Sequence, residues 1–209
     1  DGAGPRMAER LAHTIHPTYP ALTPPVADPP RHEELAGVSL PVALSAPLSR
    51  GRFATRGGFL FTHRGYSGPA VLDISHLAVR SLMDGGRPQE ILVQWTETDA
   101  EGWDVRLREG GSGEVGPLLR RHLPDRLAAR LVRESGVDSD RPLAELRREE
   151  RGALVEVLAR YPLPWTSDEG YKKAEVTGGG VALGEVDPRS LESRIGPGLY
   201  LCGEMLDAF

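Results

Sequence analysis

The sequence predicts a multidomain α+β protein in which a small all-α helical subdomain is inserted into a β domain. Segments typical of strands lie on both sides of a helix-rich region, and a glycine-serine hinge at 110–113 opens that region. Strands that follow such an insertion complete the sheet by pairing with strands that precede it. With 39% apolar residues, the chain of 209 residues can bury a hydrophobic core.

The N-terminal region combines a predicted helix with an extended segment. Pro5 stands near the start of residues 4–15, in which apolar residues recur at helical spacing as far as Ile15. Six prolines follow between positions 17 and 30. Such a dense run excludes a helix and predicts extended backbone.

The central and C-terminal elements follow from apolar periodicity. Strands are predicted at 38–40, 42–44, 59–61, 91–95 and 103–107. One helix interrupts them, with Ser67 as its cap, Pro69 in its first turn and an apolar face that reaches Leu82. Helical stretches are predicted over 118–132, broken at Pro124, and over 143–161, opened by Asp140 and Pro142. Strand-like segments return at 171–177, 181–183 and 199–202.

Composition narrows the function classes. The net charge of −5 argues against a surface for nucleic acid or an anionic membrane, and no apolar run reaches the roughly 20 residues of a membrane helix. The single cysteine, Cys202, lies in an apolar run and is interpreted as a core thiol of a reducing, cytoplasmic compartment. The N-terminus has neither a Met nor signal-peptide features, so we expect the chain to be cut from a longer one.

Two motif matches favour structural interpretations. Residues 178–184 fit G-x-G-x-x-x-G, but a phosphate cradle needs a helix directly after the glycines, and none is predicted there. A bulge or tight turn between strands is therefore favoured. His13 and His16 have no evident third ligand, so no metal site is expected. The other weak candidates, interpreted as solvated or capping residues, are His32, His76 and His122.

A denser motif runs from Phe61 to Pro69. An apolar strand leads into Thr62 and His63, and a glycine turn then opens the helix capped by Ser67. The N–H groups and the dipole at a helix start suit a carbonyl or an anion, beside which His63 could donate a proton. A structural strand–turn–helix corner is the alternative. A hydrolase using Ser67 and His63 fails, because Ser67 lacks the glycine spacing of a nucleophile elbow.

Several segments, covering essentially the whole chain, share their order and spacing with one family. They are residues 1–2, 8–15, 20–22, 61–72, 122–127, 174–181, 192–193 and 198–207. In these segments the chain resembles the YhiN-like (BaiN/RdsA-like) NAD(P)/FAD-dependent oxidoreductases. The N-terminal βαβ unit that carries the glycine fingerprint for FAD in that family is not in this sequence. The resemblance therefore implies the insert region of the flavoprotein.

The resemblance also implies a more detailed fold. It is a β-barrel related to translation-factor barrels, with the helical subdomain inserted and short stubs of a Rossmann-like FAD domain at both termini. The implied parts are a first FAD-domain stub at 1–26, the barrel at 27–110 and 167–196, the helical subdomain at 111–166 and a second stub at 197–209.

Function is implied in the same way. The chain would cover the flavin and shape the pocket of a small-molecule substrate, with FAD as cofactor and NAD(P)H as reductant. Its partner would be the remainder of the FAD-binding domain, with no nucleic acid and no membrane. The implied catalytic residues are Thr62, His63, Ser67 and Gly68. The implied cofactor-binding residues are Asp1, Gly2, Thr177, Gly179, Gly180, Gly203, Glu204 and Asp207. Alone, the fragment is expected to be inactive and flavin-free.

One function from another class remains as the alternative. By analogy with translation-factor barrels, the chain would be a stand-alone β-barrel module that binds protein or nucleic acid without catalysis. The net charge of −5 weighs against RNA as its ligand.

Overall fold

Two structural units make up the chain in the computed structural model, which describes residues 2–83 and 85–208. The first unit consists of Asp1–Thr23 and Asp168–Phe209, and the second is the continuous stretch Pro24–Ser167. Each unit has its own cluster of buried apolar residues. Within the described residues, no helix is long and apolar enough to cross a bilayer.

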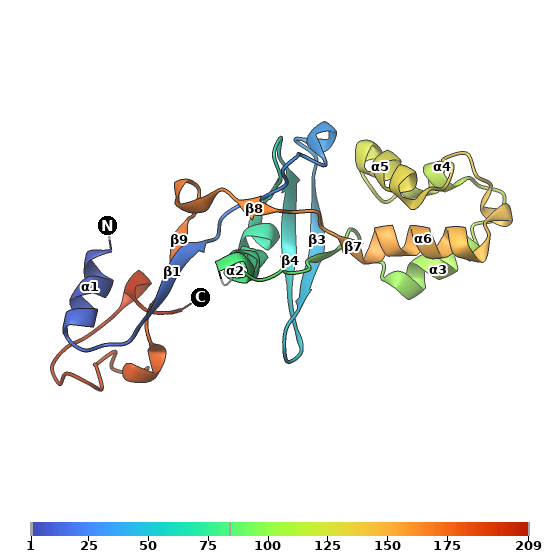
Figure 1. The fold of residues 1–209 in the computed structure, drawn as a ribbon. Helices are drawn as coiled ribbons and strands as arrows, with labels where there is room; N and C mark the ends of the chain where they lie inside the picture. The colour runs from blue at the N-terminus through green and yellow to red at the C-terminus, as the bar shows by residue number, and fades with distance from the viewer. Residues whose placement is uncertain (1, 84, 209) are drawn as a thin grey trace. The chain divides into compact units, whose positions relative to one another are not determined.

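A five-stranded antiparallel sheet forms the centre of the second unit (Figure 1). Its order is β5-β4-β3-β6-β7, with β3 at Ser39–Pro47, β4 at Arg52–Phe61, β5 at Tyr66–Ser67, β6 at Leu92–Gln94 and β7 at Tyr161–Pro162. The strands predicted at 38–40, 42–44, 59–61 and 91–95 are thus confirmed. Alternate residues of the β3–β4 hairpin are buried, among them Val42, Leu44 and Phe59.

The long helix α2, Pro69–Met83, packs against β3 and β4 as predicted. Pro69 is its first residue, and Gly68 directly precedes it with φ +100°. Ser67 belongs to β5 and is not the residue next to the helix, so the prediction of Ser67 as the cap is wrong. Gly68 takes this place because a Cβ there would lie 2.6 Å from the Gly58 carbonyl oxygen.

Four helices follow in the second unit: α3 Ala100–Arg108, α4 Val115–Arg120, α5 Asp125–Ser135 and α6 Arg148–Ala159. A 3₁₀ turn, η2, covers Leu143–Glu145. α6 packs against both α3 and α5. The predicted break at Pro124 is confirmed, since Pro124 immediately precedes α5. The last helix begins at Arg148, later than the predicted opening at Asp140 and Pro142.

The strand predicted at 103–107 is wrong, because this segment belongs to α3. Asp99 caps the helix by accepting a hydrogen bond from the Gly102 N–H at 2.9 Å. Trp103 and Leu107 are fully buried and lie four residues apart, on one side of the helix.

In the first unit, α1 covers Ala3–Arg10, and β1, Ile15–Ala21, pairs antiparallel with β9, Val176–Val181. The predicted helix to Ile15 is therefore too long. It ends because Ala12 adopts φ +68°, and Ile15 opens β1. The extended backbone predicted for the proline-rich segment is confirmed, since β1 contains Pro17 and Pro20.

Short elements complete both units. The two-residue strands β2, Pro25–Val26, and β8, Ser167–Asp168, pair at the boundary of the second unit. Single 3₁₀ turns are η1 at Glu33–Leu35, η3 at Gly170–Lys172, η4 at Leu183–Glu185 and η5 at Gly203–Met205.

Three predicted features near the C-terminus differ from the structure. Residues 171–175 lie outside β9, and Leu183 opens η4. The segment 199–202 forms no strand, apart from a single bridge between Tyr200 and Glu192. Cys202 is exposed, so its interpretation as a core thiol is wrong. Leu201 takes the core position instead, at 3% exposure.

Candidate functional site

The corner between β4 and α2 holds the predicted catalytic residues. Thr62 closes the turn: its hydroxyl oxygen accepts from the Gly65 N–H at 3.0 Å, and its own N–H donates to the Gly65 carbonyl at 2.9 Å. A Cβ on Gly65 would lie 2.2 Å from the Pro25 carbonyl oxygen, so the turn requires glycine there. His63 is exposed on this turn, and Ser67 is half-buried. The segment thus forms a strand–turn–helix corner, closed by the side chain and the backbone of Thr62.

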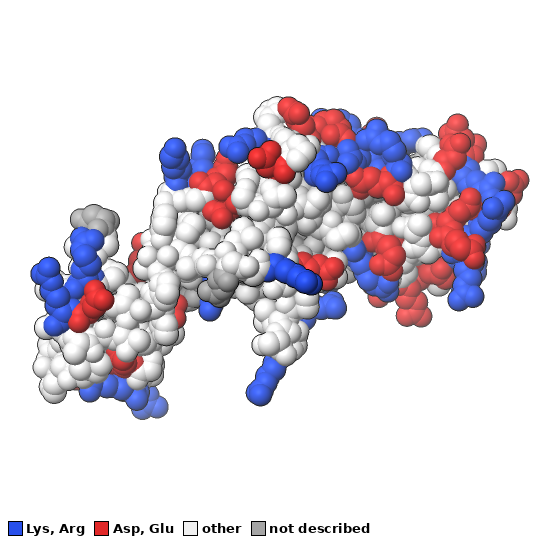
Figure 2. Space-filling model, viewed as in Figure 1, with Lys and Arg blue, Asp and Glu red and all other residues white. Residues whose placement is uncertain are grey.

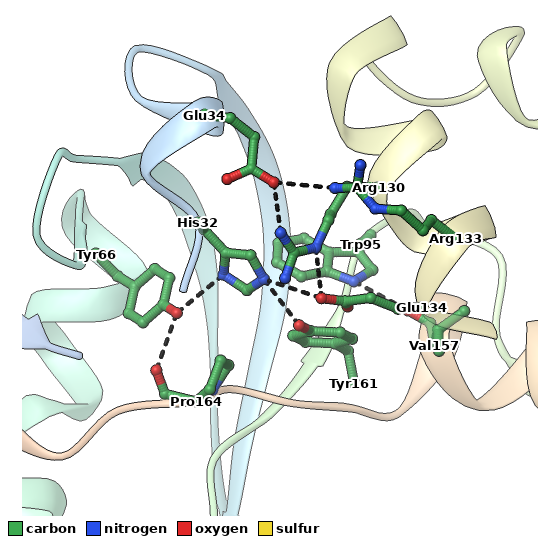
Figure 3. Close-up of polar contacts among 10 residues, drawn as sticks. All are labelled: His32, Glu34, Tyr66, Trp95, Arg130, Arg133, Glu134, Val157, Tyr161 and Pro164. Atoms are coloured by element: carbon green, nitrogen blue, oxygen red, sulfur yellow. Dashed lines mark hydrogen bonds and ion pairs between the residues drawn. The ribbon is translucent and has the colours of Figure 1, made fainter. Parts of the chain in front are cut away.

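Behind the corner lies a buried histidine (Figure 3). His32 is 5% exposed, so its interpretation as solvated or capping is wrong. Its Nδ1 lies 2.9 Å from the Tyr66 hydroxyl, and its Nε2 lies 2.9 Å from the Tyr161 hydroxyl. Tyr66 donates its only hydroxyl proton to the Pro164 carbonyl at 2.9 Å. Tyr66 can then only accept from His32, which places a proton on Nδ1.

An ion-pair network extends from this histidine to α5 (Figure 3). Glu134 lies 3.5 Å from His32 Nε2 and accepts from Arg130 Nε at 2.5 Å, and Arg130 also pairs with Glu34. Burial would raise the pKa of Glu134, but hydrogen bonds from His32, Tyr161 and Arg130 outweigh it and lower the pKa to about 2.

The two tyrosines of this network stay neutral. Burial is the main cause that raises the pKa of Tyr66 and of Tyr161, and nearby Glu134 raises both further. Every polar group named in the network has a partner. It therefore fixes the β-sheet to α5 within the second unit and leaves no group poised to react.

In the first unit, residues of β1 pack directly against the glycines of β9. A Cβ on Gly178 would lie 2.3 Å from the Tyr19 ring, and one on Gly179 would lie 2.2 Å from the Pro17 carbonyl oxygen. The pairing with β1 shifts register between His16 and Tyr19, so an irregularity of the ladder lies opposite these glycines, with its extra residue on β1.

Three segments of the first unit meet at Met205. A Cβ on Gly4 of α1 would lie 3.6 Å from the Met205 Cβ, and one on Gly180 of β9 would lie 2.5 Å from the Met205 carbonyl oxygen. The Asp207 N–H donates to the Val181 carbonyl at 3.0 Å. The structure therefore brings the start of α1, the glycines of β9 and the segment 203–207 together.

The predicted cofactor-binding residues all belong to the first unit. Gly2 is the N-cap of α1, Thr177 is half-buried in β9, and Asp1 lies outside the described residues. Gly203 has φ +76° with open space where a Cβ would be, and Glu204 beside it is exposed. The predicted catalytic residues belong to the second unit.

A serine–histidine–glutamate array was missed by the sequence reasoning. His13, 4% exposed, lies 3.2 Å from Glu185 through Nδ1 and 3.0 Å from the Ser193 hydroxyl through Nε2. Ser193 is buried, and its hydroxyl oxygen already accepts the N–H groups of Ile195 and Gly196 at 3.0 and 2.8 Å. These contacts identify it as a turn-stabilising serine and not a nucleophile. No local signal predicts the array, because 172 and 180 positions separate His13 from its two partners.

Comparison with known proteins decides the family. A family model described as "HI0933-like protein barrel and H2TH domain" matches residues 19–176. The chain belongs to this family. Its fold is thus a mixed α and β fold that contains a barrel domain, as the sequence predicted at that level of detail.

Three curated relatives of this HI0933-like chain are named as enzymes. It is 35% identical over 99% of its length to the ribosomal RNA dihydrouridine synthase of Escherichia coli strain K12, and it covers 51% of that protein. It is 30% identical over 99% of its length to the 3-dehydro-bile acid delta(4,6)-reductase of Clostridium scindens, covering 52% of it. A ribosomal RNA dihydrouridine synthase of Haemophilus influenzae is 30% identical over 83% of the chain. The chain thus spans about half the length of the first two relatives.

These findings confirm the resemblance and count against one expectation. The HI0933-like chain is a region of an oxidoreductase-family protein, as predicted. Two of the relatives' names refer to ribosomal RNA, which counts against the prediction that nucleic acid is not a partner.

The residues around Met205 fit an FAD-like ligand by their chemistry. Carboxylates accept hydrogen bonds from the hydroxyl groups of a sugar-like chain, and Glu204 and Asp207 supply two of them. Asp207 lies 3.9 Å from His16 Nε2, while Gly203 leaves the space beside Glu204 open.

Proposed function

We propose that the chain is the substrate-side region of an FAD-dependent reductase that saturates a carbon–carbon double bond conjugated with a carbonyl. The main support for this proposal is the similarity, over 99% of the chain, to two enzymes. Their names denote reductions of very different molecules. Dihydrouridine is uridine with its ring double bond saturated, and a 3-dehydro bile acid carries a carbonyl at carbon 3. In both substrates the reduced double bond is conjugated with a carbonyl.

The cofactor contacts belong to the first unit in this proposal. FAD would supply the hydride, and NAD(P)H would supply the reducing equivalents. The FAD would be held by Gly2, Gly203, Glu204 and Asp207, together with Asp1, Thr177, Gly179 and Gly180 as the resemblance implies. The meeting of α1, β9 and η5 at Met205 supports this assignment.

The substrate contacts belong to the corner in the second unit. Hydride addition to a conjugated double bond leaves an enolate, which needs one proton from an acid. His63 is an exposed titratable side chain on a rigid turn and would give that proton, while Thr62, Ser67 and Gly68 shape the corner around it. The chain would serve as an insert over the flavin, with parts at 1–26, 27–110, 111–166, 167–196 and 197–209.

The experiment uses the full-length protein that contains this chain, reconstituted with FAD and assayed for NAD(P)H oxidation with a small cyclic enone. We expect His63→Ala to lower turnover by about a hundredfold without changing flavin content. His76→Ala, a matched imidazole removal on α2, should leave turnover unchanged. Glu204→Gln with Asp207→Asn should lower flavin content instead.

Two results would contradict the proposal. One is full-length protein that takes up no flavin on reconstitution. The other is a stoichiometric flavin held by the 209-residue chain alone, which would mean that the pyrophosphate site lies within it.

A ribosomal RNA substrate would also agree with the cytoplasmic location predicted from composition.

A further inference from the structure

Positive charge is concentrated in one segment of an otherwise acidic chain. Residues 35–72 contain four arginines, Arg50, Arg52, Arg56 and Arg64, and neither aspartate nor glutamate. The whole chain has a net charge of −5, so the remaining residues carry the entire acidic excess. This segment includes β3, β4 and the corner with His63.

The register of the hairpin puts two of these arginines on one face. Arg52 and Arg56 are exposed and stand four residues apart on β4, about 13 Å along the strand. Their partners across β3 are Pro47 and Ala43, and Ser45 pairs with Ala54 between them. This outer face is therefore flat, made of small uncharged side chains with two guanidinium groups above them.

A groove follows this face. It has a volume of about 780 Å³, and Arg52, Arg56, Gln94 and Arg160 are among its lining residues. Arg56 and Ala43 also line an adjoining hollow of about 370 Å³, which includes His122. The acidic lining residues, Asp99 and Glu101 in the groove and Glu97 in the hollow, lie beside or within the start of α3, outside the sheet.

The arginines of the hairpin differ from those of the helices in their partners. The side chains of Arg52 and Arg56 form neither a hydrogen bond nor an ion pair with another described residue. On the helices, by contrast, Arg130, Arg141 and Arg151 are each paired with a carboxylate. Figure 2 shows this contrast: red and blue atoms intermingle over the helices, whereas the projecting end of the hairpin is white and blue.

Further arginines lie beside His122 at the adjoining hollow, whose lining also includes Glu97. Arg106 donates to His122 Nε2 at 3.0 Å, so that nitrogen accepts and the imidazole is neutral there. Burial, Arg106 and Arg121 together lower the pKa of His122. Arg52 and Arg56 on the hairpin are therefore followed by Arg106 and Arg121 beside His122.

We propose that this outer face of the β3–β4 hairpin docks the sugar–phosphate backbone of an RNA substrate. The inference rests on the proposed function, and it names the substrate class of that same enzyme. Unpaired guanidinium groups above a flat face bind phosphates, and guanidinium matches phosphate in geometry as well as charge. The aromatic side chains of β4, Phe53, Phe59 and Phe61, alternate with the arginines and lie on the opposite face. Docking here would therefore depend on backbone charge and not on base stacking.

The test measures binding of the full-length protein to a fluorescein-labelled RNA hairpin of mixed sequence, at 50 and 200 mM salt. Two phosphate contacts contribute about 1.4 to 1.8 to the slope of log affinity against log salt. Wild type should therefore lose about tenfold more affinity than Arg52→Gln/Arg56→Gln over this fourfold salt range. The matched control is Arg120→Gln/Arg148→Gln, which removes two exposed arginines from α4 and α6 and should keep the wild-type slope.

Each outcome has a distinct meaning. Equal slopes for both double variants would overturn the docking surface, as would tighter binding to anionic phosphatidylglycerol vesicles or to polyglutamate than to the RNA. Turnover of the small cyclic enone should be the same in Arg52→Gln/Arg56→Gln as in wild type. Unchanged enone turnover together with unchanged RNA binding would reject the docking surface alone, whereas absence of enone turnover in the wild type would reject the proposed function.

Discussion

Replacing Glu134 by glutamine tests the charge at the centre of the His32 network. The carboxylate accepts from Arg130 at 2.5 Å and lies 3.5 Å from His32, while 23% of the side chain is exposed. Glutamine keeps the shape of the side chain, removes its charge and replaces one acceptor oxygen with an NH2 donor. The part of the stability loss that varies with pH therefore reports the ionised state of Glu134.

The size of the effect follows from the pKa of Glu134. Its value falls from 4.5 to about 2 in the folded protein, and one unit corresponds to about 1.4 kcal/mol. Because Glu134 is partly exposed, solvent screening reduces the contribution of the ionised carboxylate to the free energy of unfolding to about 1 kcal/mol. Because the folded pKa is depressed, this contribution is complete above the unfolded pKa. It disappears as the pH falls from about 4.5 through about 2.

Urea unfolding followed by tryptophan fluorescence measures this contribution. Trp95, Trp103 and Trp165 all belong to the same unit as Glu134, so the signal reports that unit. Glu134→Gln should cost about 1 kcal/mol at pH 7, and the difference from wild type should narrow toward pH 2. The control, Glu156→Gln, breaks an exposed pair with Arg160 and should cost less than about 0.5 kcal/mol. A difference that stays constant from pH 7 to pH 2 would refute the electrostatic explanation.

Two further predictions concern the first unit. Gly178→Ala should destabilise it by about 2 kcal/mol or displace Tyr19, because the new Cβ would lie 2.3 Å from the ring; Gly184→Ala, with open space around it, is the neutral control. Amide hydrogen exchange of β1 measures the effect, and unchanged protection in Gly178→Ala would contradict it. Cys202 should react with a thiol reagent in the native protein at the rate of an exposed thiol, and reaction only after unfolding would contradict its exposure.

Elements with a local signal could be predicted from the sequence. α2 and α5 begin where proline precedes or opens an apolar periodic run, because proline fixes the backbone for a first turn. An irregularity between strands at the β9 glycines could also be predicted, since no helix follows them. At the corner, the order of strand, glycine turn and helix was visible in the sequence, which is why this part of the candidate site was found.

Where tertiary packing decides, the same reasoning fails. In residues 103–107, Trp103, Val105 and Leu107 alternate with polar residues and resemble a strand. A spacing of four between the two buried residues fits a helix equally well, and packing of α3 against α6 selects the helix. His32 shows a second limit. Its tyrosine partners lie 34 and 129 positions away, and nothing near it in the sequence indicates that they surround it.

Net charge describes a local binding surface poorly, because it sums over surfaces that lie apart from one another. Several carboxylates in the helices, among them Asp104, Glu134 and Glu150, pair with arginines, so these pairs cancel in the total. At physiological ionic strength, charges more than about 8 Å away are largely screened in any case. A phosphate at the hairpin would therefore respond to Arg52 and Arg56 far more than to a net charge of −5. The distribution of charge along the chain, combined with strand alternation, is the signal that predicts a basic face in an acidic protein.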